Sequence, residues 1–572
     1  LREAFDICND NFTELYGGTT SALGFKSEGT NFTGSLLIGH STTGTISSAQ
    51  YNTGVGIGAL DALTTGDSNI AIGYNAGTSL ETGNQNILIG GTAGDALTSG
   101  GQNVAIGHNA LGNEDGHGRN VAVGHSALEN LNAGTNANNV AIGYLAGLAM
   151  STGVQNTIIG AEAGDALTTG NHNIAIGFRA LSTEDTGSNS TAIGYYALNK
   201  QNDNNNMYNI AIGHSAGQEV TTGSNNVLFG GLTGSNITTG HYNIAIGTQA
   251  LFTEDAHGRN IAIGHNALKV QDAGQDAYNV AIGYETGKAV TTGYKNTVVG
   301  NRSLQAATTA YENVAMGYQA LFTNTDGSKM VAIGGNALVN FNPSTAGEIF
   351  NVAVGYAAGY NSLTSSNNVF VGGLVAYSNT TGSSNTYVGY ASGYSNTTGS
   401  HNTGVGRQAL NKSTDTGSNV AVGYRALYEN INGSMSVAIG NEALRDQNPA
   451  SDSNPLNTAV GYQAGLLVTT GTNNTIMGGY AGDALTTGTN NVAIGRSALS
   501  TEDTYGYNVA VGTYALLNQN AGDNAYNTAV GYGAGENVTT GTLNTIIGGS
   551  AGAALTSGAR NVLIGVRAGD AL

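Results

Sequence analysis

The chain has 572 residues, of which 89 are glycine, 3 are proline and none is tryptophan, and its formal net charge at pH 7 is −19. An acidic chain lacks the basic footprint that nucleic-acid binding needs, and a single cysteine excludes both an intramolecular disulfide framework and a cysteine-rich metal site. Hydrophobic residues make up 40% of the chain and recur at regular positions, which excludes a disordered chain. No apolar run reaches the length of a membrane span.

The first sixteen residues predict a short N-terminal helix, residues 1–16. A 4-3-4-3 spacing of apolar residues is the seam of a short coiled coil, here formed by Leu1, Phe5, Cys8, Phe12 and Leu15. Two heptads are marginal alone, so we expect this segment to hold several chains in register, with Cys8 serving packing rather than redox chemistry. Residues 17–34 follow as a polar connector.

From residue 35 to residue 572 the sequence repeats one motif, for example "NIAIGYNAG" at 69–77. The glycine that closes Asn-apolar-small-apolar-Gly, here called the index glycine, recurs 31 times, mostly at a spacing of 17 residues. Four copies form a higher unit of 70 residues, as from Gly73 to Gly143 and from Gly143 to Gly213. A fixed period of this size predicts a solenoid, in which each copy forms one coil.

Each copy predicts a strand followed by turns. Ile70 and Ile72 alternate with Ala71, which is the period of a short strand, and Gly73 permits a tight bend. We expect the next letters, "YNAG", to begin a second extended piece, and the common "TTG" to turn the chain back. Asparagine stands four residues before the index glycine in 27 of 31 copies. We interpret it as a turn residue whose side chain hydrogen-bonds coil upon coil, rather than as a ligand ladder.

The higher unit carries a packing pattern. Its four coils run Ala-Gly, Ala-Gly, Ala-Leu, Ala-Leu after the strand, and the second coil replaces the central alanine by a bulky residue. These bulky residues are Leu88, Ile158, Leu228, Val298, Phe370, Ile476 and Ile546. We expect them to point towards other chains, because one coil looks too polar to enclose a core alone. The pattern therefore favours an oligomer, with a monomeric β-helix left open.

The longest insertions are "GNALVNFNPSTAGEIFN", Gly335 to Asn351, and "NEALRDQNPASDSNPLN", Asn441 to Asn457. They contain all three prolines, which we expect to stiffen exposed turns: Pro343, Pro449 and Pro455. Because binding residues tend to lie in loops on a rigid scaffold, these insertions are candidate receptor contacts, and tolerated surface insertions are the other interpretation.

Four acidic pairs recur in the third coil of a higher unit. They are Glu114-Asp115, Glu184-Asp185, Glu254-Asp255 and Glu502-Asp503. Paired carboxylates suggest a glycosidase, but neighbours in sequence need not face one substrate, and copies four coils apart are about 19 Å from one another. We interpret them as solvated loop charges and expect no enzyme, no catalytic residue, no cofactor and no metal, although His117 and His257 beside them leave open adventitious Ca²⁺ or transition-metal binding.

Units such as "NVAVGHSAL" and "SVAIGNEAL" resemble the head repeats of trimeric autotransporter adhesins, whose parallel β-rolls intertwine as trimers, and equally the repeats of phage tail fibres. The likeness covers about residues 35–572, and the 17-residue coil is longer than is usual in the adhesin heads. The opening "LREAFDICNDNFTELYG" is similar to the start of fibre and other virion structural proteins of marine phages.

Together these features predict an all-β parallel β-roll or β-solenoid, an intertwined homotrimeric fibre with the β-roll shaft at 35–572. The resemblance implies a phage tail-fibre shaft or receptor-contact region in the virion, which adheres to a host-surface receptor or glycan and contacts other fibre or virion proteins. We expect the chain to insert into no membrane and to bind no nucleic acid. A bacterial surface adhesin or filament subunit at the cell surface is the second hypothesis. A polysaccharide-cleaving tailspike and an ice-binding protein are further ones.

Overall fold

A computed structural model describes residues 25–29, 32–39, 46–450 and 453–571. Within these ranges no helix is present, and the predicted coiled coil at 1–16 lies outside them. The chain forms two compact units, Leu1–Tyr278 and Asn279–Leu572. Both are parallel β-solenoids with a 17-residue period, which confirms the fold class predicted from the repeat.

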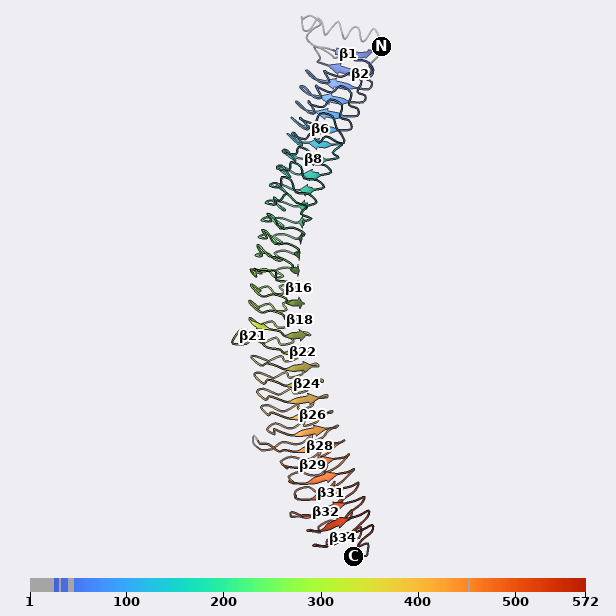
Figure 1. Ribbon diagram of the computed structural model, residues 1–572, viewed down its shortest axis with the longest axis vertical. Coiled ribbons are helices and arrows are strands. Elements are labelled where there is room, and N and C mark those ends of the chain that lie inside the picture. Colours follow the sequence, from blue (N-terminus) through green and yellow to red (C-terminus); the bar gives the residue numbers. More distant parts are fainter. Residues whose placement is uncertain (1–24, 30–31, 40–45, 451–452, 572) are drawn as a thin grey trace, which may run out of the picture. The chain divides into compact units, whose positions relative to one another are not determined.

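The first unit begins with an antiparallel pair, β1 and β2, which falls partly within the predicted connector. From β2 to β15 each strand then pairs in parallel with the next strand along the chain (Figure 1). Its strands are β1 (Phe25–Gly29), β2 (Phe32–Ile38), β3 (Thr53–Val55), β4 (Ile70–Ile72), β5 (Ile87–Ile89), β6 (Val104–Ile106), β7 (Val121–Val123), β8 (Val140–Ile142), β9 (Thr157–Ile159), β10 (Ile174–Ile176), β11 (Thr191–Ile193), β12 (Ile210–Ile212), β13 (Val227–Phe229), β14 (Ile244–Ile246) and β15 (Ile261–Ile263).

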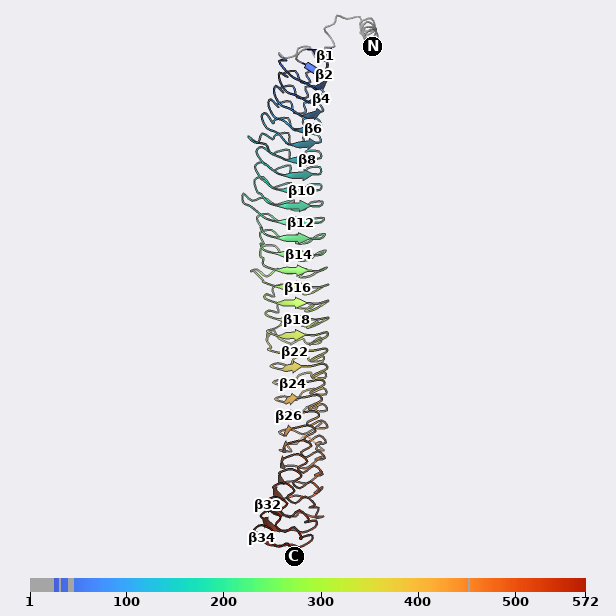
Figure 2. The ribbon, with the colours of Figure 1, turned by 90° about the vertical axis from the view of Figure 1, so that its right-hand side faces the viewer.

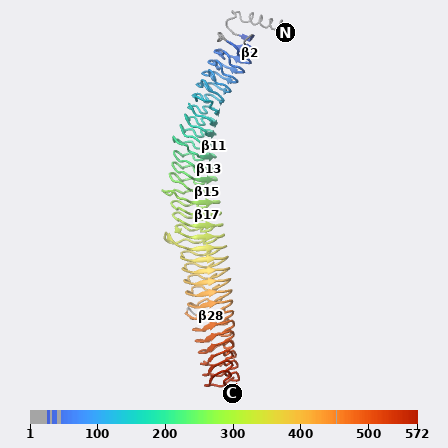
Figure 3. The same cartoon turned by 45° about the vertical axis from the view of Figure 1, so that its right-hand side comes forward.

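The second unit repeats this plan, with a short parallel pair, β19 and β21, set apart from the main sheet (Figure 1). Its strands are β16 (Val280–Ile282), β17 (Thr297–Val299), β18 (Val314–Met316), β19 (Gly327–Ser328), β20 (Val331–Ile333), β21 (Gly347–Glu348), β22 (Val352–Val354), β23 (Val369–Val371), β24 (Thr386–Val388), β25 (Thr403–Val405), β26 (Val420–Val422), β27 (Val437–Ile439), β28 (Thr458–Val460), β29 (Thr475–Met477), β30 (Val492–Ile494), β31 (Val509–Val511), β32 (Thr528–Val530), β33 (Thr545–Ile547) and β34 (Val562–Ile564). In each unit the strands stack one above the next (Figure 2, Figure 3).

Each described coil of the repeat has one strand in the main sheet, so the prediction of a second extended piece after the index glycine is wrong. The segment after β4 is a run of turns, in which Asn75 and Gly77 adopt left-handed backbone angles with φ of 53° and 56°. In other coils the place of Gly77 is taken by leucine at a similar angle, as at Leu181 (φ 53°). Residues in the left-handed region bend the chain sharply, which an extended strand does not do.

The strands bury their central residue inside their own coil. Ala71 is fully buried, whereas Ile70 and Ile72 on the opposite face are 38% and 39% exposed. Ile158 and Phe370 are likewise fully buried within the single chain. The expectation that these bulky residues point towards other chains is therefore wrong, because the turn segment of each coil folds over the central residue and one chain encloses its own core.

The four-coil pattern is explained by volume compensation within this core. A methyl group on Gly147 or Gly164 would lie 3.1 or 3.3 Å from the Cδ1 atom of Ile158. The two Ala-Gly coils thus leave the space that the bulky central residue fills, and the Ala-Leu coils fill the same space with leucine beside a central alanine such as Ala175. Interiors are packed densely, so a large residue at one position requires a small one opposite.

The repeated asparagines form a buried ladder, which confirms their structural interpretation. Asn69 accepts hydrogen bonds at its Oδ1 atom from the backbone N and the Nδ2 atom of Asn86, at 2.9 and 3.0 Å. The Nδ2 atom of Asn86 also donates to the carbonyl oxygen of Gly100 at 2.9 Å. Each asparagine therefore satisfies backbone groups in the coils beside it, and buried polar groups require such partners.

The long insertions are anchored to the core. Phe341 is fully buried, and Gly347–Glu348 of the first insertion pairs with Gly327–Ser328. Pro449 and Pro455 of the second insertion are buried. The prediction that all the prolines lie in exposed turns is therefore wrong for these two.

Candidate functional site

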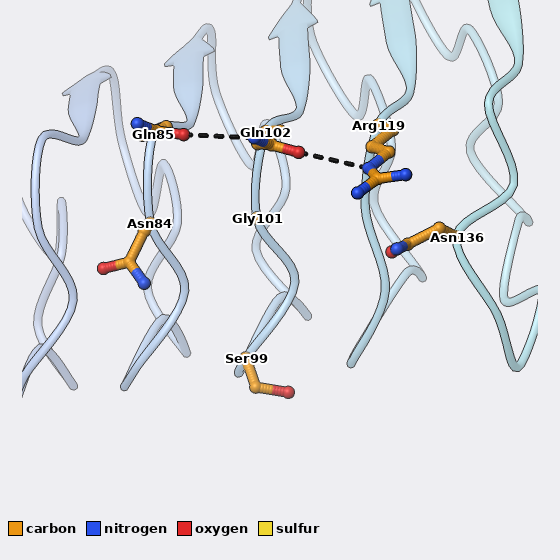
Figure 4. Close-up of a pocket in the computed structure, with 7 residues that line it drawn as sticks. All are labelled: Asn84, Gln85, Ser99, Gly101, Gln102, Arg119 and Asn136. Carbon is orange, nitrogen blue, oxygen red and sulfur yellow. Dashed lines mark hydrogen bonds between the residues drawn. The ribbon is translucent and has the colours of Figure 1, made fainter.

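A polar groove opens on the surface of the first unit and has a volume of about 290 Å³ (Figure 4). It is lined by Asn84, Gln85, Ser99, Gly101, Gln102, Arg119 and Asn136. These residues come from successive coils, and the sticks in Figure 4 run along the solenoid from one coil to the next. The groove thus presents amide and guanidinium groups to solvent.

Three of these residues occupy one position in consecutive coils, directly before the ladder asparagine. Gln85, Gln102 and Arg119 have left-handed backbone angles with φ of 61°, 63° and 64°. Their side chains are joined in a row: Gln102 Nε2 donates to Gln85 Oε1, and Arg119 Nε donates to Gln102 Oε1, both at 3.2 Å. The row fixes the guanidinium of Arg119 at the edge of the groove.

One glycine, Gly101, lines the groove and lies against Gly118 of the next coil. A methyl group on Gly118 would lie 1.7 Å from the carbonyl oxygen of Gly101, so only glycine permits the two backbones to approach so closely. The backbone N of Gly118 donates to Asn136 Oδ1 at 3.1 Å. This bond holds Asn136, which lies in a 19-residue coil, beside Arg119.

The four acidic pairs are not simply solvated charges, because each glutamate is fully buried at a corner of its coil. The aspartates of the pairs are exposed or half-buried. In most other coils this corner position holds an apolar residue such as Leu97 or Leu167. A buried glutamate offers no carboxyl to a surface saccharide, so the pairs do not form a glycosidase arrangement in which two carboxyls flank a substrate.

Burial raises the pKa of these glutamates, because the charged form loses its hydration. The pKa of Glu254 rises to about 8, and that of Glu502 to about 7. The pKa values of Glu114 and Glu184 are also raised by burial. Hydrogen bonds oppose the rise: at Glu184, the backbone N of Gly187 and the Nε2 of Gln201 donate at 2.7 and 2.9 Å.

The two histidines lie beside buried glutamates, as the sequence suggested. Candidate ligand atoms of Glu114, Asp115 and His117 lie within 4.8 Å of one another, and Glu254, Asp255, His257 and Asp272 form a second such group. The oxygens of Glu254 already accept hydrogen bonds from the backbone N of His257 and from Asn260 Nδ2, at 3.2 and 3.4 Å. The corner is therefore a hydrogen-bonded turn.

The outer face of the main sheet is apolar. The residues flanking each central position form columns of mostly isoleucine, valine and threonine. Among the flanking residues, Ile72, Ile142 and Phe229 are 39%, 38% and 51% exposed. Exposed tyrosines follow directly after the index glycine in several coils, as at Tyr74 and Tyr144. A continuous apolar surface of this kind is typical of an interaction site.

The sequence analysis named the two long insertions as candidate receptor contacts, which stays a prediction, and it missed the Arg119 groove. The available signal was the run Gln85, Gln102 and Arg119 at 17-residue intervals in one column. No protein-family model, curated protein or solved structure matches this chain. None of the described residues belongs to a helix long and apolar enough to span a membrane.

Proposed function

We propose that the chain is the shaft or receptor-contact region of a fibre that adheres to a cell surface, most simply a phage tail fibre. The observation that carries this proposal is the outward apolar face of a regular solenoid. A repeated scaffold displays the same surface many times, so weak contacts add by avidity without one deep pocket. The likeness of "NVAVGHSAL" units to tail-fibre and adhesin repeats supports the same function.

The proposal includes a homotrimer. Its interface is the outer face of the strands, not the central residues that the sequence analysis expected to face other chains. The columns that contain Ile72 and Ile142 are apolar and long, and three chains around one axis would cover them. Burial of apolar surface is the main favourable term in association. The tyrosines beside these columns suit the margin of such an interface, since they combine an apolar ring with a polar hydroxyl.

Attachment of the full chain to bacterial cells tests the function. The fluorescently labelled protein is incubated with a panel of bacterial isolates. The bound label is measured with and without an excess of unlabelled protein as competitor. We expect saturable attachment that unlabelled chain displaces. Absence of displaceable attachment to any cell type would contradict adhesion, and release of reducing sugars from surface polysaccharide would favour a tailspike.

A bacterial surface adhesin or filament subunit differs from a tail fibre in its location. Immunogold labelling with an antibody to the chain separates the two. Label on virions supports the tail fibre, and label on the bacterial surface supports the adhesin.

A further inference from the structure

Two corners of the first unit have nearly the same sequence but a different environment. The segments are "EDGHGRN" at 114–120 and "EDAHGRN" at 254–260. In both segments a glycine precedes the arginine: Gly118 in the first and Gly258 in the second. Its backbone N donates a hydrogen bond, at 3.1 Å, to a side chain of the following long coil. The acceptor is Asn136 in the first corner and Asp276 in the second. The two corners are therefore a natural comparison with one decisive difference.

In the second corner the arginine is neutralised and covered. The Nε atom of Arg259 lies 3.2 Å from Asp276 Oδ2. Its guanidinium carbon lies 5.8 Å from the ring centre of Tyr242 and 5.4 Å from that of Tyr278. The Nη1 atom also donates to the Tyr278 hydroxyl at 2.6 Å. An arginine held by an acid and two rings has little capacity for another anion.

In the first corner each of these partners is replaced by an amide. Gln102, Asn138 and Asn136 occupy the positions of Tyr242, Tyr278 and Asp276. Among the described residues Arg119 makes no ion pair, and its one side-chain hydrogen bond runs from Nε to Gln102. The two terminal nitrogens of the guanidinium remain directed to the groove.

Three amide oxygens of the groove accept hydrogen bonds within the chain. Asn84 Oδ1 accepts a backbone N–H of the preceding coil at 2.6 Å, Gln85 Oε1 accepts the next glutamine amide at 3.2 Å, and Asn136 Oδ1 accepts a backbone N–H at 3.1 Å. The amide nitrogens of these three residues and the guanidinium of Arg119 are left as donors. Unused amide and guanidinium donors therefore predominate around one cation, which fits a ligand rich in acceptors and negative charge.

We propose that this groove binds an acidic saccharide, with a carboxylate or sulfate on Arg119 and sugar oxygens on the amides of Asn84, Gln85 and Asn136. The guanidinium fork matches the geometry of a planar carboxylate, and charge-assisted hydrogen bonds are the strong ones. The net charge of −19 repels polyanions at long range, so the preference comes from these local donors. The inference rests on the proposed adhesion, because it names the surface chemistry that is recognised.

Calorimetric titration of the full chain tests the inference. The probes are trigalacturonate, its methyl ester, and a sulfated carrageenan oligosaccharide of similar length, each in 0.15 M NaCl. We expect the methyl ester to bind at least about tenfold more weakly than trigalacturonate, because charged hydrogen bonds are lost. The carrageenan arm separates sulfate from carboxylate recognition.

Three variants locate the binding. Arg119→Gln and Asn136→Asp should each weaken the binding of the tighter anionic probe by about tenfold or more, the second because it recreates the ion pair of the other corner. Arg259→Gln is the matched control and should leave the affinity unchanged. Circular dichroism checks that all three remain folded, and folded Asn136→Asp tests the site even if Arg119→Gln does not fold.

The inference would be overturned if trigalacturonate and its methyl ester bind with equal affinity and the sulfated oligosaccharide binds no more tightly than the ester. Equal losses in the Arg119 and Arg259 variants, or no binding of either anionic probe, would also overturn it. Attachment to cells is measured separately. If the chain attaches to cells but does not bind acidic saccharides, the adhesion proposal stands and the groove proposal is wrong. If it binds acidic saccharides but does not attach to cells, only the groove proposal stands.

Discussion

The ring of Tyr387 lies in the space that a side chain at Gly404 would need. The two residues are direct partners in the parallel pairing of β24 and β25. A methyl group on Gly404 would lie 2.8 Å from the Tyr387 Cδ1 atom. A large central residue is thus accommodated by the removal of a side chain from the coil that follows it.

Replacing Gly404 by alanine should therefore destabilise the second unit. The added methyl group overpacks a buried site, and such changes cost about 1–3 kcal/mol. Gly373→Ala is the control, because a methyl group there would meet only Tyr390 Cδ2 at an ordinary 3.7 Å. Thermal unfolding followed by circular dichroism measures both, and equal midpoints for the two variants would contradict the packing argument.

Glu254 should make stability depend on pH. Its pKa in the fold is about 8, above its value of 4.5 in an unfolded chain. Below pH 4.5 the group is protonated in both states, and between about 4.5 and 8 only the unfolded chain ionises. Stability should therefore fall as pH rises through this window.

The variant Glu254→Gln should flatten this part of the pH profile and raise stability at pH 8, by up to a few kcal/mol, because the neutral amide does not ionise. Glu81→Gln, at an exposed glutamate, is the control. Chemical denaturation at pH 5 and pH 8 measures the difference. A Glu254→Gln profile parallel to that of the unmodified chain would show that the carboxyl does not control this dependence.

The asparagine ladder should contribute strongly to stability. Asn156 accepts the backbone N of Asn173 at 2.8 Å and donates to the carbonyl oxygen of Gly170 at 2.9 Å. Asn156→Ala leaves both groups buried without these partners, at about 1–3 kcal/mol for each group. The exposed Asn202→Ala is the control. Hydrogen exchange should rise in the coils around residue 156, and unchanged protection there would contradict a structural role.

The outer strand face should hold the proposed trimer together. The triple variant Ile72→Asp, Ile142→Asp and Ile212→Asp places charges on the apolar columns. It should dissociate the proposed trimer into single chains, since burying an unpaired charge in the interface is costly. The matched control carries aspartate at three exposed threonines of the turns, Thr82, Thr152 and Thr222. Light scattering should give three times the 57.6 kDa chain mass for the unmodified protein and the control. A monomer in the unmodified protein would reject the trimer.

The sequence by itself determined the period, the strand in each copy, the parallel stacking and the structural use of the asparagines. These features depend on local patterns repeated at a fixed spacing: once one coil stacks on the next, residue 71 meets residue 88 and residue 69 meets residue 86. A repeat of this kind transmits its register along each unit without contacts from distant parts of the chain.

Only the tertiary structure decided which strand face lies inside. Alternation says that Ala71 and Ile72 face opposite sides, but it does not say which side the coil encloses. The left-handed turn residues close the coil over the small residue and leave the isoleucine outside. The same closure buries Glu254. It also brings Asn136 to Arg119 and Asp276 to Arg259, so two arginines in nearly identical segments differ in charge environment because of a residue one coil further along the chain.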